Sequence, residues 1–274
     1  MDIYSQLAQT ELTQVSSSAQ IPLLTGCDSS KPLLVLVWPQ LGDFDSLEYA
    51  WWLQRSPSFI AENQIQLRAI GIGDRRSGEK FCDYTGFPAD QLWIDPHAQL
   101  HRQLGLYEGL SRTWPGLTSQ QSVWLNLLLM CAGIGSPGTL KEVLRGYTGD
   151  RQAPQLIGDQ EVVKLAPFPT VTGSVFALAG GKNFQRPFEL ATLRLRNMIE
   201  VLDNWTTYVP DARYITQRGG TFLFDQHQRL IFEHRDPGIL GFSPTMANPI
   251  TAISNALQRP ASVVTPVLHR KINE

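Results

Sequence analysis

The residues best suited to chemistry lie in one short turn, residues 39–46, which reads Pro-Gln-Leu-Gly-Asp-Phe-Asp-Ser. Asp43, Asp45 and Ser46 stand at its end, where a helix is expected to begin. Acidic and hydroxyl side chains are typical helix caps because they accept hydrogen bonds from free backbone N–H groups. Asp45 and Glu48 have the spacing of a capping box. We therefore interpret Asp45 and Ser46 as caps, with a small-molecule or metal pocket as the alternative.

Ser46 lacks the sequence context of a hydrolase nucleophile. Such a serine needs a nearby histidine that is oriented by an acid, and the chain contains no Gly-x-Ser-x-Gly pattern. The five histidines show no spacing that predicts a triad; they are His97, His101, His227, His234 and His269. We do not expect hydrolase chemistry at this turn.

The three cysteines, Cys27, Cys82 and Cys131, are widely spaced. They form no CxxC pair, and no Cys/His spacing is typical of zinc. One interpretation is that each is a small buried apolar side chain. The other is residual thiol chemistry, with Cys82 as the redox candidate and a Cys82–Cys131 pair as a further option. No motif predicts a metal or a cofactor.

Alternating strands and helices are expected to position the turn. The continuous apolar run at 33–38 predicts a buried central strand. Further along, we expect helix 46–55, strand 65–72, helix 78–85, strand 91–94, helix 98–104, a hairpin of strands 220–224 and 229–234, and helix 249–258. Such alternation indicates a parallel sheet with covering helices. Residues 1–30 are expected to be a polar lead-in with a short helix near the start.

Residues 106–213 do not continue this alternation. Helices are expected at 122–132 and 139–146, and a longer amphipathic helix is expected to start at Pro187, a residue favoured in a first helical turn. We therefore expect one domain over 1–274, with a core at about 30–105 and 214–260. A large, mostly helical insertion at about 106–213 would precede the C-terminal hairpin.

The turn resembles the peroxiredoxin motif Pro-x-x-x-Thr-x-x-Cys. Pro39 stands in the proline position, Asp43 in the threonine position and Ser46 in the position of the peroxidatic cysteine. Residues 218–225 are similar to the family's Arg-Gly-x-Phe-x-x-Asp strand with one extra residue, which makes Arg218 the equivalent of the arginine that faces peroxide. The resemblance implies an α/β, thioredoxin-like fold of the peroxiredoxin type with a degenerate active position.

Longer strings are similar to the peroxiredoxin-like branch of the AhpC/TSA superfamily, including its cyanobacterial and plastid members. They cover residues 39–46, 81–88, 180–190 and 233–238. Peroxide reduction needs a cysteine thiolate that becomes a sulfenic acid. Together with Ser46, the resemblance therefore predicts a protein without peroxidase activity that has a binding, assembly or regulatory role. The alternative is a thiol-dependent antioxidant oxidoreductase that uses Cys82 or Cys131.

Two polar sites late in the chain each have two interpretations. Arg218 either keeps the ancestral pocket role and pairs with Asp43 or Asp45, or lies at the surface edge of a strand. Residues 234–236, His-Arg-Asp, form either a binding loop or a solvated turn.

Composition bears on partners and location. The net charge is −2 and no basic run is present, so we expect no nucleic-acid binding. Residues 1–20 do not read as a signal peptide, and we expect a cytoplasmic protein. The chain has few charged residues, and we expect the segment 165–205 to offer a docking face for a protein or membrane-associated partner. The resemblance implies a homodimer and a place at the cytosolic face of thylakoid membranes.

Overall fold

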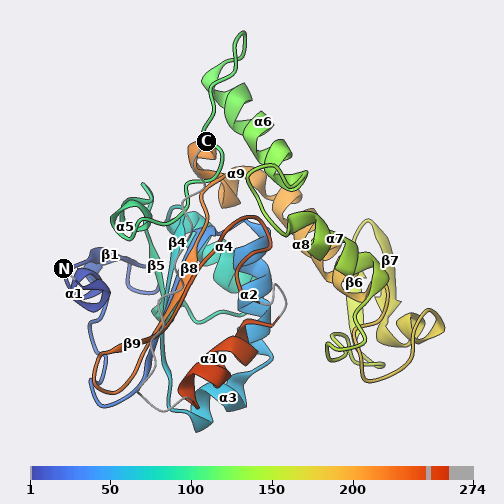
Figure 1. The fold of residues 1–274 in the computed structure, drawn as a ribbon, viewed down its shortest axis with the longest axis horizontal. Helices are drawn as coiled ribbons and strands as arrows, with labels where there is room; N and C mark the ends of the chain where they lie inside the picture. Colours follow the sequence, from blue (N-terminus) through green and yellow to red (C-terminus); the bar gives the residue numbers. More distant parts are fainter. Residues whose placement is uncertain (1, 245–247, 259–274) are drawn as a thin grey trace.

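The computed structural model describes residues 2–244 and 248–258, and its main element is a seven-stranded sheet. The strand order is β2-β1-β5-β4-β3-β8-β9 (Figure 1). The strands are β1 (Glu11–Gln14), β2 (Gln20–Pro22), β3 (Leu33–Gln40), β4 (Gln66–Ile72), β5 (Leu92–Ile94), β8 (Gly220–Phe224) and β9 (Leu230–Arg235). Strands β3, β4 and β5 are parallel, and the β8–β9 hairpin is antiparallel to β3. This arrangement confirms the predicted thioredoxin-like α/β fold.

Strand β3 lies at the centre of the sheet and is buried along its whole length. Successive strand residues point to opposite faces. Leu34 and Leu36 therefore join one apolar cluster and Leu33 and Val35 join another. The continuous apolar run in the sequence has this physical origin, since both faces of β3 are covered.

Helices cover both faces of the sheet. The first cluster includes residues of α2 (Phe44–Gln54), α4 (Arg75–Thr85) and α10 (Pro249–Leu257). The second includes residues of α1 (Ile3–Ala8) and α5 (Gln99–Gln103). Two shorter elements complete this part of the fold, α3 (Pro57–Glu62) and the 3-10 turn η1 (Ala89–Gln91).

The N-terminal segment is more ordered than the sequence indicates. The expected short helix is α1, but β1 and β2 follow it and extend the sheet. Strand β1 pairs antiparallel with β5, with Thr13 opposite Ile94. The expectation of a polar lead-in over residues 1–30 is therefore wrong. Strand β2 is a short edge strand and β1 lies between β2 and β5, so both depend on strand pairing and have little local apolar signal.

The insertion lies to one side of the sheet (Figure 1). Its helices are α6 (Ser119–Cys131), α7 (Thr139–Thr148), α8 (Glu189–Asp203) and α9 (Trp205–Tyr208), with 3-10 turns η2 (Gly173–Leu178) and η3 (Ala212–Tyr214). It also holds a separate hairpin, β6 (Val162–Leu165) and β7 (Phe168–Thr172), which the sequence analysis does not predict. The insertion is thus mostly helical, but with a small sheet of its own.

Charged contacts fasten the insertion to the sheet lobe. Arg194 of α8 donates to Glu48 of α2 at 2.8 Å and to the carboxylate of Glu142 of α7 at 2.9 Å. The apolar cluster on this side of the sheet also includes Leu190 and Leu193 of α8.

The domain boundaries predicted from the sequence stay a prediction. No helix in residues 2–244 and 248–258 is long and apolar enough to span a membrane.

Candidate functional site

The turn after β3 leads directly into α2. Asp43 is the N-cap: it has extended backbone angles, φ −74° and ψ 148°, and its side chain accepts from the Asp45 backbone N–H at 3.0 Å. The predicted capping box of Asp45 and Glu48 is therefore wrong, because the helix begins at Phe44, before both residues. Asp45 lies inside the first turn, where its carboxylate is available for tertiary contacts.

Asp45 joins three segments of the chain. It is buried, with 1% of its surface exposed. Its Oδ1 accepts from the Leu240 backbone N–H at 2.7 Å, and its Oδ2 lies 3.3 Å from Nη1 of Arg218. Burial and the negative charge of Asp43 raise its pKa well above the ordinary value, although the Arg218 cation opposes the shift.

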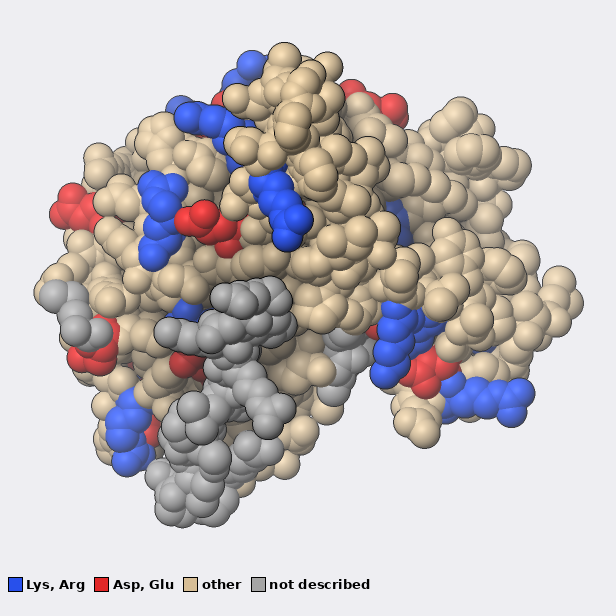
Figure 2. Space-filling model, turned by 45° about the horizontal axis from the view of Figure 1, so that its top comes forward, with Lys and Arg blue, Asp and Glu red and all other residues tan. Residues whose placement is uncertain are grey.

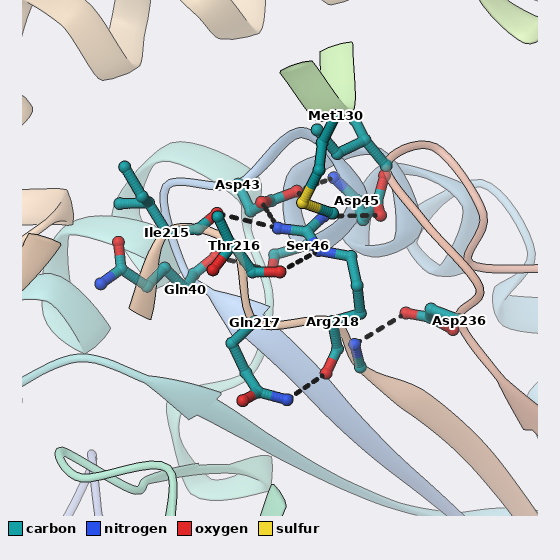
Figure 3. A network of polar contacts seen from close by, with 12 residues as sticks. Gln40, Asp43, Asp45, Ser46, Met130, Ile215, Thr216, Gln217, Arg218 and Asp236 are labelled. Carbon is teal, nitrogen blue, oxygen red and sulfur yellow. Dashed lines mark hydrogen bonds and ion pairs between the residues drawn. The ribbon is translucent and has the colours of Figure 1, made fainter. Parts of the chain in front are cut away.

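Arg218 is the centre of the site (Figure 3). It is fully buried, and Nη2 donates to Oδ2 of Asp43 at 2.6 Å. Nε donates to the Thr216 carbonyl and Nη2 to the Ile215 carbonyl, each at 3.0 Å. The interpretation as a surface arginine at a strand edge is wrong, and pairing with Asp43 and Asp45 is confirmed.

The guanidinium has no donor left for a ligand. Its five N–H groups match five acceptor contacts within the protein, two at Asp43 and one each at Asp45, Thr216 and Ile215. Two carboxylates also offset its charge. Arg218 therefore holds the turn to the approach of β8 and offers neither charge nor hydrogen bonds to an incoming peroxide.

A third carboxyl group, Asp236, completes the network. It is 4% exposed, and its Oδ2 accepts from the Gly219 backbone N–H at 3.1 Å. A Cβ on Gly219 would lie 2.3 Å from the Val37 carbonyl oxygen and 2.9 Å from Asp236 Oδ2, so only glycine fits there. Burial raises the pKa of Asp236 to about 8 despite the Arg218 cation.

The interpretation of residues 234–236 as a solvated turn is therefore wrong. His234 and Arg235 end strand β9, and the strand places Asp236 inside the protein. Sequence reasoning named this acid but did not connect it to Arg218. The sequence signal for this connection is the position of Asp236 directly after β9, the strand that pairs with β8.

Ser46 is fully buried, and its Oγ donates to the Gln40 carbonyl at 2.9 Å. Its side chain thus closes the turn rather than facing a substrate. Among the described histidines, His101 contacts the Trp38 carbonyl and His234 the Gly241 carbonyl, so neither is directed at Ser46. His269 lies outside the described residues.

An apolar cap covers the network. Met130, at the end of α6, packs with Ile239 and Leu240, and all three are buried. Figure 3 shows Met130 over the Asp45–Arg218 pair. Of the three acids and Arg218, Asp43 has the most exposed side chain, at 11%. The insertion therefore shields the turn from solvent.

Comparison with known families matches this chain to a family described as AhpC/TSA antioxidant enzyme, over residues 52–182 and 176–238. These segments cover more than half of the chain. The protein belongs to the AhpC/TSA family. The match begins after the turn that contains Ser46. No curated protein and no solved structure matches the chain.

In this AhpC/TSA protein the cysteines lie outside the Arg218 network. Cys82 is half-buried on α4, and burial followed by the charge of Asp83 raises its thiol pKa to about 12. Cys131 is exposed at the end of α6, but partial burial of its thiol and the negative charge of Asp43 also raise its pKa. Both are free cysteines, and neither is favoured as a thiolate at neutral pH.

A metal ion at the turn would have to compete with Arg218 for the carboxylates there. Arg218 already occupies the carboxylates of Asp43 and Asp45. Within the described ranges, no group of three or more His, Cys, Asp or Glu side chains is arranged to hold a metal ion.

Proposed function

We propose that this AhpC/TSA protein lacks peroxidase activity and acts as a binding protein with an assembly or regulatory role. The observation that carries the proposal is the engagement of Arg218, whose five N–H groups all contact acceptors within the chain. The resemblance implies that the equivalent arginine of a peroxidase faces the peroxide, and Arg218 is directed at these acceptors instead.

The position of Ser46 supports the same proposal. It lies in the first turn of the helix after the central strand, where the resemblance expects the peroxidatic cysteine. A serine hydroxyl is not ionised near neutral pH and forms no sulfenic acid. Because its Oγ is buried and bonded to the Gln40 carbonyl, it has no role as a nucleophile here.

The direct test is turnover of hydrogen peroxide with a thioredoxin or glutathione reducing system. We expect no turnover above the rate without protein. A second candidate function, a thiol-dependent oxidoreductase, is favoured by the exposure of Cys131. Turnover that disappears in Cys131→Ser or Cys82→Ser would establish that candidate and contradict the proposed lack of peroxidase activity.

A protein partner would use the apolar residues of segment 165–205. Leu178 is 89% exposed and Phe168 is 56% exposed. Deleting the segment would remove buried residues of α8, so single surface changes are the better test. Partner recovery is expected to fall with Leu178→Lys and to stay unchanged with Leu117→Lys, an exposed apolar position outside the segment. Equal recovery with both variants contradicts this docking face.

The proposal extends to a homodimer and to peripheral association with the cytosolic face of a thylakoid membrane. Figure 2 shows charged side chains scattered over one face, with wide uncharged areas between them. Sedimentation of the purified protein tests the dimer. Co-sedimentation with phospholipid vesicles tests the membrane contact, which Leu178→Lys should weaken.

A further inference from the structure

Two apolar hollows meet at Phe44, the first residue of α2. The first has a volume of about 370 Å³ between α7 and α8, with Val143, Ala191 and Leu240 among its lining residues. The second, of about 180 Å³, lies over Asp43 and includes Trp124 and Trp205 in its lining. The first volume is in the range of small-molecule sites, which are usually concave and mostly apolar.

The two hollows adjoin one another. Phe44, Cys131, Met198 and Ile239 line both of them. A ligand that passes these four shared residues would extend from the α7–α8 groove to the tryptophan pair. The shape therefore suits an elongated molecule better than a compact one.

The lining offers no unpaired charge. Arg194 borders the first hollow, but its guanidinium donates to the carboxylates of Glu48 and Glu142. Asp43 borders the second, but both of its oxygens contact Arg218. A charged ligand would lose its hydration without gaining a counter-ion, and an uncharged ligand avoids this cost.

The rim also presents apolar side chains to solvent. Tyr147 is 54% exposed, Phe188 53% and Met198 38%. Trp124 is 36% exposed and packs on Trp205 with ring centroids 5.1 Å apart. An apolar chain in the groove would remove parts of these side chains from water, which is the main driving force for such binding.

We propose that the joined hollows bind a neutral, elongated apolar small molecule of the long-chain alcohol type. The assignment rests on the binding function proposed above, and it adds the chemical class of the ligand. The chain of the ligand lies between α7 and α8, and one end reaches the Trp124–Trp205 pair. Of the three acids and Arg218, Asp43 borders the second hollow and the other three line neither hollow.

The test is calorimetric titration with hexanol, octanol and decanol. Affinity should rise about fourfold per added methylene, since each buried CH₂ contributes about 0.8 kcal/mol. Decanoate and decyltrimethylammonium have the same chain with a charge, and should bind at least tenfold more weakly than decanol. Equal or tighter binding of either ion would overturn the assignment of a neutral ligand.

Filling the first hollow should block binding. Ala191→Leu enlarges the α8 wall and Val143→Phe the α7 wall, so each should weaken decanol binding at least tenfold while circular dichroism shows a folded chain. The control is Ala179→Leu, an exposed alanine of the insertion that lines neither hollow. Unchanged binding in both filled variants, or no binding by the wild type, overturns the proposal.

Sedimentation separates the ligand from a second copy of the chain. A dimer that forms without alcohol and is lost in Ala191→Leu would show that the groove is an interface and overturn the proposal. Peroxide turnover is measured separately. Alcohol binding with turnover would reject only the non-peroxidase function, and absence of both would reject only the ligand site.

Discussion

Arg218 and Asp45 form a buried ion pair, with Nη1 3.3 Å from Oδ2, that joins the approach of β8 to the first turn of α2. The two residues are 173 positions apart in the chain. With Asp43, the pair makes a closed group of charges below an apolar cap. Next to this group, Ser46 stands where the resemblance expects a reactive thiol, and its Oγ donates a hydrogen bond to the Gln40 carbonyl.

Arg218→Met should lower the free energy of unfolding by about 3–5 kcal/mol, because it leaves buried carboxylates without their cation. Urea denaturation followed by tryptophan fluorescence measures the change. The matched control is Arg229→Met, which removes an exposed pair with Asp225 and should cost below about 1 kcal/mol. Similar losses in the two variants would contradict a central role for Arg218.

Asp236→Asn should change how stability depends on pH. The folded pKa of Asp236 is about 8, and the ordinary value is 3.8. Between these values the unfolded chain loses the proton while the folded protein keeps it, so this carboxyl makes stability fall as pH rises from about 4 to 8. The variant should lack that fall, and the two slopes should differ by at most about 1.4 kcal/mol per pH unit.

Asp225→Asn provides the opposite case for the same measurement. Burial opposes ionisation of Asp225, but hydrogen bonds from Arg229 and from the backbone lower its folded pKa overall. Its contribution is present above the unfolded pKa and is lost as pH falls through the folded pKa. The variant should therefore lose stability near pH 7. Parallel pH profiles for wild type and Asp236→Asn would show that Asp236 does not titrate as described.

Ser46→Cys should not create a peroxidase. The new thiol would be buried beside Asp43 and Asp45, and burial and negative charge both raise a thiol pKa. Unfolding should become easier by about 1 kcal/mol, because the hydrogen bond to the Gln40 carbonyl is weakened. Ser46→Ala isolates that bond and should cost a similar amount. Rapid peroxide turnover by Ser46→Cys would show that the site is open and competent.

Arg194→Met should loosen the insertion from the sheet lobe. Glu48 is almost fully buried and would lose its cation, at a cost of about 3–5 kcal/mol, whereas Glu142 would keep its ion pair with Arg145. Hydrogen exchange should report faster opening of α7 and α8. Arg213→Met, which removes an exposed pair with Asp211, is the control and should change stability by less than about 1 kcal/mol. Unchanged exchange in α8 would contradict the fastening role.

The sequence predicts an element correctly where the residues of that one segment contain the whole pattern that indicates it. The apolar run of β3 and the turn between β8 and β9 are both read directly from neighbouring residues. Strands β1 and β2 and the β6–β7 hairpin were missed because they are short and gain stability from pairing rather than from composition. The start of α2 was misplaced because Asp43 and Asp45 are both good caps, and the contacts of Asp45 with Arg218 and Leu240 decide between them.

The amino-acid sequence is enough to show that the turn at 39–46 contains no cysteine and to point to Asp43, Ser46 and Arg218 as the residues of interest. The full engagement of Arg218, the position of Asp236 beside it and the cover provided by Met130 are visible only in the folded chain. Burial and charge compensation depend on segments up to 195 positions apart, such as Asp45 and the Leu240 N–H. No local pattern contains such contacts.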